Sequence, residues 1–344
     1  MASAYRALGL ALGQPPVSLD DSLAIVERAE AGGFRIFGVG DLLADSLTFV
    51  GALTQRSVHA DLFTSIAGWT RTPVATALGA LTASELCSGR FRLGLGPMPK
   101  VWSEQWHGVD YSQPVVRMRE FVSAVRAACR SRATAPAEHA GRLYSFAGYT
   151  RPSVTPQRPV PIYLGATRPG MTHLAGEIAD GLIANAVHSV AWLRDVQLPA
   201  LEAGLEAAGR AREGVDVGAL VICAIDDDRD GAVELVRRAI SFYFVAPYFR
   251  DLLVEHGFTR DLEQGQAAFK AGAREAAARA VSDELVETVA LCGTGSEVRR
   301  KLERYVGLVD WLMLSPPIGH VPEIARVQME RIVVELSPER TLNR

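Results

Sequence analysis

The sequence predicts an α/β protein that folds as a (β/α)8 barrel of the TIM type, with insertions. Short apolar runs alternate with helical patterns eight times along the chain, and regular alternation of this kind indicates a parallel sheet. Eight strand–helix units favour a closed barrel over an open sheet. The chain has 344 residues, whereas such a barrel needs about 250. We therefore expect one barrel domain over residues 1–344, with insertions at about 130–160 and 240–285, where the alternation breaks.

The first four strands are predicted from short apolar runs that are each followed by a helical pattern. Ser18 with Asp21 resembles a capping box and begins the first helix, which Gly32-Gly33 ends. A second helix is expected over Ser46–Ser57. Thr72-Pro73 begins the third, because proline is favoured at the first helical position. The four strands are Arg6–Leu12, Phe34–Val39, Leu62–Ile66 and Phe91–Leu95.

The alternation resumes after a segment rich in proline and glycine, Arg130–Pro161, which is expected to be a long loop or a hairpin. Residues 230–290 are helical in composition almost throughout. Thr294 and Glu297 form a capping box that begins the helix before the last strand. Further helices are expected over Pro169–Ala179, Val190–Ala208 and Glu323–Leu336. The last four strands are Val160–Leu164, Gly181–Ala184, Val217–Ala224 and Val309–Leu314.

Composition excludes several classes of protein. The chain is 48% hydrophobic and 22% charged, which excludes a disordered or collagen-like chain. It has no run of 18 apolar residues, so we expect no membrane-spanning helix, and its start reads as a strand and not as a signal peptide. A net charge of −3 argues against a nucleic-acid partner. The four cysteines form no C-x-x-C pair, which predicts reduced thiols and a cytoplasmic protein.

The motifs for metal binding and hydrolysis are missing from the sequence. Its seven histidines form no H-x-H or H-x-x-x-H pair, so no metal site is expected. No Gly-x-Ser-x-Gly motif supports a serine hydrolase. A glycosidase would need two carboxylates at strand ends, where Asp41 and Asp226 make a weak case. Only three lysines occur, so an anion site here would be built from arginine and backbone N–H groups.

The segment Gly165–Leu174 has two readings that the local sequence leaves open. A strand ends in Gly-Ala-Thr-Arg and Pro169 then begins a helix. Free N–H groups and the positive end of the helix dipole would face the carboxyl ends of the strands, where Arg168 could add charge-assisted hydrogen bonds. This is either a phosphate cradle or an ordinary helix start. Gly94-x-Gly96 is likewise either part of a dinucleotide motif or a pair of small residues at a crowded barrel mouth.

Several short pieces, in a fixed order, carry a family resemblance. The most specific is Pro161–Ala166, which is followed by Leu174–Gly181. The other pieces are Ala29–Phe34, Gly40-Asp41-Leu42, Thr72-Pro73 with Ala80-Leu81-Thr82, Gly89–Gly96 and Cys292-Gly293-Thr294. Through them the chain resembles the luciferase-like flavin and deazaflavin oxidoreductases. The stretch Gly94–Lys100 is most similar to the reductases that use coenzyme F-420, especially methylene-tetrahydromethanopterin reductase.

The resemblance implies a luciferase-like barrel, usually dimeric, that holds a flavin or deazaflavin over the strand ends. Asp41 is expected near the ring. A bulge with a cis peptide at Ser65–Ile66 is expected behind the ring. Asp41 and His107 are the candidate catalytic residues, and Trp69 and Trp102 the candidates for a substrate pocket. The remaining residues expected to bind the cofactor are Ser65, Ile66, Ala67, Gly68, Gly96, Pro97, Met98, Gly165, Ala166, Thr167, Arg168, Gly170, Met171, Gly176 and Glu177.

The function expected from the resemblance is that of a coenzyme F-420-dependent oxidoreductase, a reductase of secondary or biosynthetic metabolism that acts on a small molecule. Leu42 replaces the histidine of related alcohol and sugar-phosphate dehydrogenases, and the glutamate that the latter have near Pro99 is missing, which argues against those activities. Bacterial luciferase has a phosphate-binding arginine near Pro97 that is missing here. Two alternatives stay open: an FMN-dependent monooxygenase, and a catalytically inactive flavin-binding protein.

Overall fold

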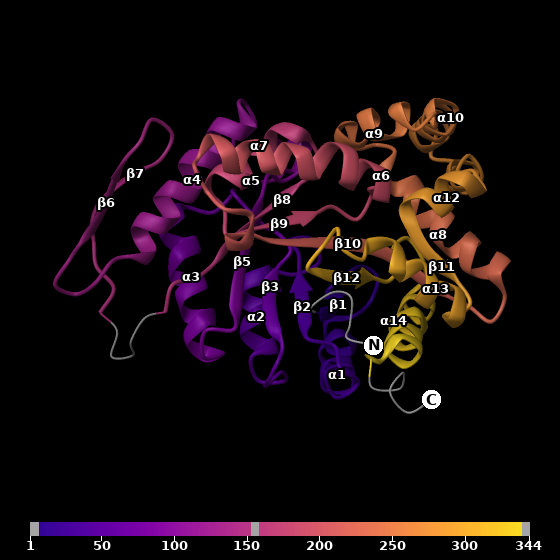
Figure 1. Cartoon of the computed structure of the whole chain (residues 1–344), viewed down its shortest axis with the longest axis horizontal. Coiled ribbons are helices and arrows are strands. Elements are labelled where there is room, and N and C mark those ends of the chain that lie inside the picture. Colours follow the sequence, from indigo (N-terminus) through magenta and orange to yellow (C-terminus); the bar gives the residue numbers. More distant parts are fainter. Residues whose placement is uncertain (1–6, 153–157, 339–344) are drawn as a thin grey trace.

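The centre of the computed structural model, which describes residues 7–152 and 158–338, is a closed barrel of eight parallel strands (Figure 1). Each strand pairs with its neighbour in the ring, and the last pairs with the first. The predicted (β/α)8 barrel is therefore confirmed. Its strands are β1 (Ala7–Leu12), β2 (Ile36–Val39), β3 (Asp61–Thr64), β5 (Phe91–Gly96), β8 (Ile162–Ala166), β9 (Gly181–Ala184), β10 (Asp216–Ile225) and β12 (Trp311–Ser315).

Helices surround the barrel, and three of them begin at the predicted caps. Ser18 accepts the N–H of Asp21, Thr72 accepts that of Ala75, and Thr294 forms the capping box with Glu297. Within the described residues, no helix has both the length and the apolar character needed to cross a membrane. The helices are α1 (Leu19–Ala31), α2 (Ser46–Leu53), α3 (Pro73–Leu86), α4 (Pro114–Cys129), α5 (Pro169–Ile178), α6 (Val190–Trp192), α7 (Leu198–Ala207), α13 (Gly295–Leu302) and α14 (Pro322–Leu336).

Two predicted helices differ from those in the structure. The helix expected over Ser46–Ser57 ends at Leu53 and is followed by a turn. The helix expected over Val190–Ala208 is divided by a wide turn, η2 (Leu193–Gln197), between α6 and α7. Pro199 lies in the first turn of α7. Because proline has no N–H to donate, the regular helical hydrogen bonds cannot continue through this position.

Aromatic side chains fill the interior of the barrel. The ring of Phe63 packs between those of Tyr163 and Trp311, with centroids 5.1 and 5.0 Å away. Gly181 and Gly218 make room for these rings, because a Cβ at either position would lie 2.1 Å from the ring of Tyr163 or of Trp311. The barrel is thus a packed core, and a ligand is expected at the ends of the strands.

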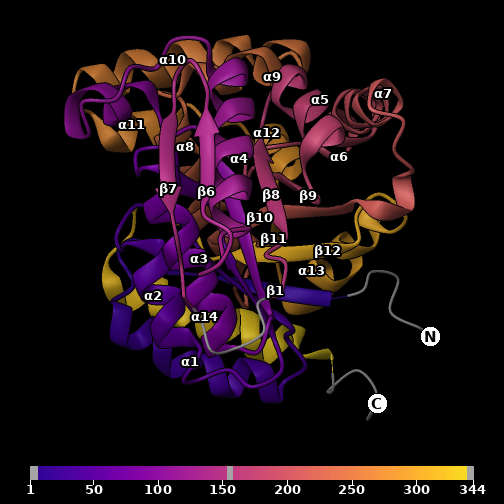
Figure 2. The same cartoon turned by 90° about the vertical axis from the view of Figure 1, so that its left-hand side faces the viewer.

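The first insertion folds as an antiparallel hairpin, β6 (Ala137–Ala140) and β7 (Ser145–Tyr149). It stands away from the barrel beside α4 (Figures 1 and 2). The carboxylate of Glu120 on α4 accepts the N–H groups of Leu143 and Tyr144 at 2.6 and 2.7 Å, which anchors the tip of the hairpin to that helix. Of the two forms expected for this segment, a loop or a hairpin, the structure has the hairpin.

The second insertion is helical, as its composition predicted, but a short strand that was not predicted follows it. β11 (Ala290–Gly293) begins directly after the last helix and pairs with the end of β10. Its four residues are too few to show an alternating pattern. The helices are α8 (Arg229–Tyr243), α9 (Arg250–Glu255), α10 (Thr259–Lys270), α11 (Arg274–Arg279) and α12 (Asp283–Val289), with the short turn η4 (Pro247–Phe249) before α9.

A buried carboxylate joins α1 to the turn that precedes β3. Glu30 is only 7% exposed and accepts the N–H groups of Val58, His59 and Ala60 at 2.7–3.0 Å. The hydroxyl of Ser57 donates to it as well, at 2.8 Å. Burial acts to raise the pKa of Glu30, but these hydrogen bonds to the ionised form lower it below its ordinary value. The carboxylate therefore holds the chain at the entrance to β3.

We expect Glu30→Gln to lower the free energy of unfolding by about 2 kcal/mol, because an amide cannot accept all of these N–H groups. The contribution of Glu30 is complete above the pKa of an unfolded glutamate, about 4.3. It is lost as the pH falls through the lower pKa of the folded state. Urea unfolding at pH 7, and at a series of pH values below about 4.3, measures both effects. Glu27→Gln, on the exposed side of the same helix, should change stability by less than about 0.5 kcal/mol, and an equal loss in both variants would contradict this role.

Candidate active site

Four segments that the sequence analysis selected lie at the carboxyl ends of four consecutive strands of the ring. Gly40-Asp41 follows β2, the Ser65–Gly68 segment follows β3, Gly96–Met98 ends β5, and Gly165–Arg168 ends β8. These strands pair in that order. The segments are therefore neighbours on one side of the barrel mouth, and they form the candidate site.

The third barrel strand is interrupted at this mouth. β3 ends at Thr64, and the chain rejoins the sheet as β4 (Ala67–Gly68), which pairs with the end of β5. Between them the Ser65–Ile66 peptide is cis, as expected. The predicted strand Leu62–Ile66 is thus split, because the backbone of Thr64 moves against Gly94. A Cβ on Gly94 would lie 2.0 Å from the oxygen of Thr64, and the Thr64 hydroxyl donates to the Gly94 carbonyl at 2.8 Å.

Asp41 fixes this interruption in place. One carboxylate oxygen accepts the N–H of Gly68 at 2.9 Å, and the other accepts that of Ser46, at the start of α2, also at 2.9 Å. Arg71 binds both oxygens, at 2.5 and 3.1 Å, and also contacts Asp45. The carboxylate therefore ties the bulge, the loop after β4 and α2 together.

Asp41 is one of the two candidate catalytic residues, but its contacts do not suit a proton donor. Burial acts to raise its pKa, but the hydrogen bonds from Arg71, Ser46 and Gly68, with the charge of Arg71, hold the pKa below its ordinary value. An ionised carboxylate whose oxygens are all occupied is a poor proton donor near neutral pH. Asp41 is better described as a positioning residue. Sequence reasoning missed Arg71, although its place just before the cap of α3 was a signal.

The side chain of Ile66 rests on two glycines at the mouth. A Cβ on Gly96 or Gly165 would lie 2.8 Å from a carbon of the Ile66 side chain. Met98 lies in the same way against Gly68. The hydroxyl of Ser65 is directed into the barrel toward Gly38, so Ser65 offers only its backbone to the mouth. Glycine and apolar side chains thus form a smooth floor that suits a planar ring.

The start of α5 offers unused hydrogen-bond donors beside this floor. Within the described residues, the N–H groups of Thr167, Arg168 and Gly170 donate to no protein acceptor. The side chain of Gln197 donates to the carbonyl of Ala166, and that of Trp192 donates to the carbonyl of Thr167. These two hydrogen bonds fix the orientation of the peptide groups in this segment. Free donors at the positive end of a helix dipole suit an anion. Of the two readings of this segment, the geometry therefore fits the phosphate cradle.

Three residues assigned to the cradle from sequence lie elsewhere on α5. The N–H of Met171 donates to Arg168 within the helix, and its side chain is buried. Gly176 faces α7, because a Cβ there would lie 2.2 Å from the oxygen of Leu201. Glu177 forms an ion pair with Arg119. Gly176 and Glu177 are about 10 Å along the helix from its start, so their expected contact with a phosphate is not supported.

The second insertion contacts the mouth through Arg168. The guanidinium of Arg168 lies 3.1 Å from Asp251 and donates to the carbonyl of Pro247 at 3.2 Å. Tyr111 and Tyr248 are neighbours of this group. Burial raises the pKa of Tyr248 to about 12, and the nearby Tyr111 adds to the rise. Burial also raises the pKa of Tyr111, while the positive charge of Arg168 lowers it in part. The sequence did not indicate these contacts between the insertion and the start of α5.

The expected substrate-pocket residues differ in their exposure. Trp69 is 1% exposed and packs against Tyr111, with ring centroids 5.5 Å apart, so it belongs to the wall of the site. Trp102 is half-buried and stacks on Trp106 at 4.8 Å. Trp106, which the sequence analysis missed, is 63% exposed. His107, at the end of the turn η1 (Trp102–Trp106), is also exposed.

The described residues contain no group of three or more histidine, cysteine, aspartate or glutamate side chains placed to hold a metal ion. All four cysteines are free thiols. The polar groups that the mouth does present are backbone N–H groups at the start of α5 and a positioned carboxylate at the bulge. They suit the binding of a planar group that carries a phosphate.

Comparison with known proteins gives consistent matches. The family model for luciferase-like monooxygenases matches residues 4–310. The 5,10-methylenetetrahydromethanopterin reductase of Archaeoglobus fulgidus is 31% identical over 253 residues, which cover 72% of this chain and 74% of that protein. The coenzyme F-420-dependent tetrahydromethanopterin reductase of Methanopyrus kandleri matches with a TM-score of 0.83 at 24% identity, over 97% of this chain and 99% of that one.

A second solved structure, of an F-420-dependent secondary alcohol dehydrogenase with an F-420–acetone adduct, matches with a TM-score of 0.74 at 20% identity. The match covers 95% of this chain and 98% of the dehydrogenase chain. At these identities, the two structural matches establish the fold alone. The match to the family model and the reductase of Archaeoglobus fulgidus extend the similarity to the level of sequence.

We expect Asp41→Asn to lower the free energy of unfolding by about 2 kcal/mol, because the amide cannot pair with Arg71 while accepting both N–H groups. Asp45→Asn is the matched control. Asp45 also contacts Arg71, but it is more exposed, and asparagine caps a helix as well as aspartate. Asp45→Asn should lower the free energy of unfolding by less than about 0.5 kcal/mol. Urea unfolding of the two variants tests this, and equal stabilities for Asp41→Asn and the parent protein would show that the carboxylate is not needed.

Proposed function

The chain belongs to the family of luciferase-like monooxygenases, and on that premise we propose that it is an oxidoreductase that uses the deazaflavin coenzyme F-420. The observation that carries the proposal is the pairing of a smooth floor around Ile66 with free N–H donors at the start of α5. The matched Methanopyrus kandleri structure is described as a coenzyme F-420-dependent reductase, which supports the choice of deazaflavin. The reaction proposed is the reduction of a small molecule in secondary or biosynthetic metabolism.

The residues present fit such a cofactor. The N–H groups of Thr167, Arg168 and Gly170 would hold its phosphate. The bulge would lie against its ring, with the side chain of Ile66 supported by Gly96 and Gly165. When bound, coenzyme F-420 supplies hydride transfer, so the protein needs mainly to orient the ring against the substrate. Asp41 keeps the bulge in register with β5. Trp102 and Trp106 provide an apolar surface beside β5, where the substrate would bind.

The first test is cofactor preference. We expect coenzyme F-420 to bind at least tenfold more tightly than FMN, a difference of about 1.4 kcal/mol. Fluorescence titration of the purified protein with each cofactor measures it. Tighter binding of FMN would replace this proposal with a flavin-dependent monooxygenase. Tight binding of coenzyme F-420 without turnover of any small molecule would indicate an inactive binding protein.

The second test places the phosphate. Thr167→Glu should weaken cofactor binding at least tenfold, because its charge would lie against the phosphate and occupy the positive end of α5. Thr167→Gln has a similar size without the charge and should weaken binding much less. The melting temperature without cofactor should be nearly the same in both variants. If Thr167→Glu binds the cofactor as well as the parent does, the phosphate lies elsewhere.

We also propose that the protein is a homodimer, located in the cytoplasm. Leu78 and Leu86 on α3 are 47% and 53% exposed, and a second copy of the chain would cover them. Light scattering should give a mass of about twice 37.1 kDa. A monomeric mass at micromolar concentration would contradict the dimer.

A further inference from the structure

A second cavity opens at the opposite end of the barrel from the candidate active site. Its volume is about 610 Å³, within the range of roughly 300–1,000 Å³ that small-molecule sites occupy. Ile162, the first residue of β8, and Asp180, directly before β9, line it. The cavity therefore lies at the amino ends of these strands, and its other walls come from the C-terminal ends of α4 and α5.

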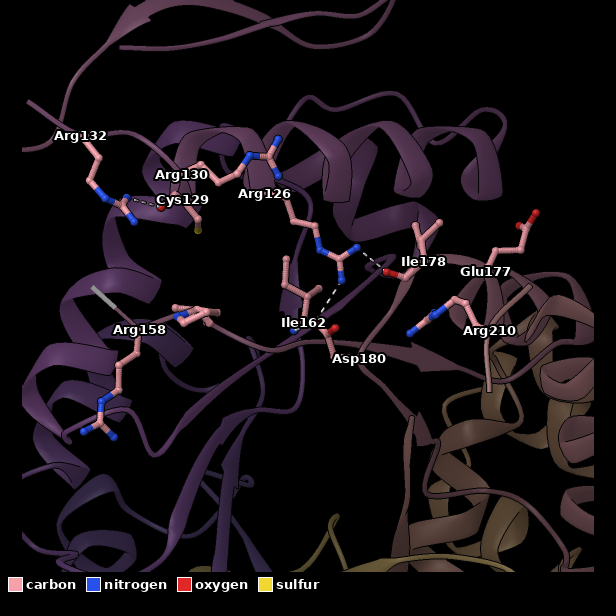
Figure 3. A pocket seen from close by; sticks show the side chains of 12 residues that line it. Arg126, Cys129, Arg130, Arg132, Arg158, Ile162, Glu177, Ile178, Asp180 and Arg210 are labelled. Atoms are coloured by element: carbon pink, nitrogen blue, oxygen red, sulfur yellow. Dashed lines mark hydrogen bonds and ion pairs between the residues drawn. The ribbon is translucent and has the colours of Figure 1, made fainter. Parts of the chain in front are cut away.

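Five arginines surround this cavity. Figure 3 shows Arg126, Arg130 and Arg132 along one side, with Arg158 and Arg210 at opposite ends. They come from α4, from the segment after it, from the irregular segment before β8 and from the loop after α7. The fold thus gathers one kind of charge from distant parts of the chain.

The acidic residues of the cavity do not balance these charges. Asp180 is paired with Arg126 at 3.0 Å and also accepts the N–H of Ile162. Glu177 is paired with Arg119, which is not part of the lining. Both carboxylates are therefore already paired, Asp180 with an arginine of the lining and Glu177 with one outside it.

Among residues 7–152 and 158–338, three other lining arginines have no carboxylate partner. Arg210 donates to the carbonyls of Gly176 and Ala179 at 2.7 Å, and Arg158 donates to that of Ser88 at 3.0 Å. Arg130 is exposed, and within the described residues its guanidinium has no carboxylate partner. A bond to a carbonyl uses one or two of the five N–H donors of a guanidinium and leaves its charge in place. Donors remain for a further acceptor.

The rest of the wall is apolar. Val160, Ile162 and Ile178 lie among the arginines, together with the half-buried thiol of Cys129. A metal ion would be repelled by this net positive charge, and a purely apolar ligand would leave the guanidinium donors unsatisfied. Arginine binds phosphate oxygens in pairs through its planar fork. The lining therefore suits a ligand with a phosphate group and a small apolar part.

We propose that this cavity is a second ligand site, which binds a phosphorylated small molecule at the amino-terminal end of the barrel. Its phosphate would be bound by donors of the lining arginines, and the remainder of the ligand would rest on Ile162 and Ile178. The site is independent of the proposed function, because its residues are separate from those at the start of α5. The two anion sites lie at opposite ends of the same helix.

Calorimetric titration with pyrophosphate and with ADP, on the full chain, tests the proposal. Pyrophosphate presents the phosphate group alone, whereas ADP adds a ribose and a planar aromatic base whose faces can pack on apolar side chains. We expect pyrophosphate to bind with a dissociation constant below about 1 mM, and ADP to bind more tightly. Arg130→Gln with Arg158→Gln should weaken binding of both at least tenfold, because two charge-assisted contacts are lost. Equal affinities for the two ligands would assign the site to the phosphate alone and overturn the apolar part of the proposal.

Two controls separate this site from the active-site cradle and from general charge effects. Thr167→Glu, at the start of α5, should leave pyrophosphate binding at this cavity within twofold of the parent. Arg56→Gln removes one exposed arginine that pairs with Glu27 and should also stay within twofold. If Thr167→Glu abolishes binding while the double arginine variant binds normally, the anion occupies the cradle and the proposal is wrong. Absence of any binding at 10 mM would also overturn it.

A chemical readout gives the position directly. Three of the four cysteines are buried, whereas Cys129 is half-buried and lines the cavity. Alkylation at pH 8.5, followed by mass spectrometry of the peptides, should modify Cys129 first. Saturating ADP should slow that modification at least fivefold in the parent and not in the double arginine variant. An unchanged rate in the parent would place the ligand outside the cavity.

Discussion

The carboxylate of Asp41 holds the break in the third barrel strand, and the shape of the candidate site depends on it. A regular strand would continue past Thr64 and leave no bulge at the mouth. Here the chain leaves the sheet after Thr64, and the Asp41 carboxylate accepts the N–H of Gly68, where the chain rejoins it. Arg71 and the N–H at the start of α2 hold the carboxylate in position. A buried charge of this kind is tolerated because every oxygen is paired. The bulge is therefore held by the Asp41 carboxylate as well as by the pairing of β4 with β5.

Packing explains why the mouth is smooth. Phe63, Tyr163 and Trp311 fill the interior below the mouth, and a Cβ at Gly96 or Gly165 would collide with Ile66. The side chain of Ile66 takes the space that those glycines leave. Bulky rings within the barrel and small residues at its rim together confine a ligand to the strand ends. The chemistry proposed for the site needs orientation more than acid–base groups, and this geometry supplies orientation.

Arginine serves several ends in a chain with almost no lysine. Arg71 stabilises a carboxylate, Arg168 joins the second insertion to the start of α5, and Arg210 holds the carbonyls at the other end of that helix. A guanidinium can make several such bonds at fixed angles and still keep its charge. This is why the arginines of the amino-terminal cavity can be structural and yet remain available to an anion. Helix α5 connects the two regions where the structure offers anion donors.

The sequence by itself determined the eight strand–helix units and the caps at Ser18, Thr72 and Thr294, because periodicity and capping act within a few residues. It also placed the mouth segments, since strand ends meet in a barrel, and the family resemblance added the cis peptide. Only the tertiary structure decided the roles of Gly176 and Glu177, which depend on what α7 and α4 present to α5. The tertiary structure also decided three other features: the pairing of Asp41 with Arg71, the contact of Arg168 with Asp251, and the arginine cavity. Each joins residues far apart in the chain, so packing determines it and local patterns do not.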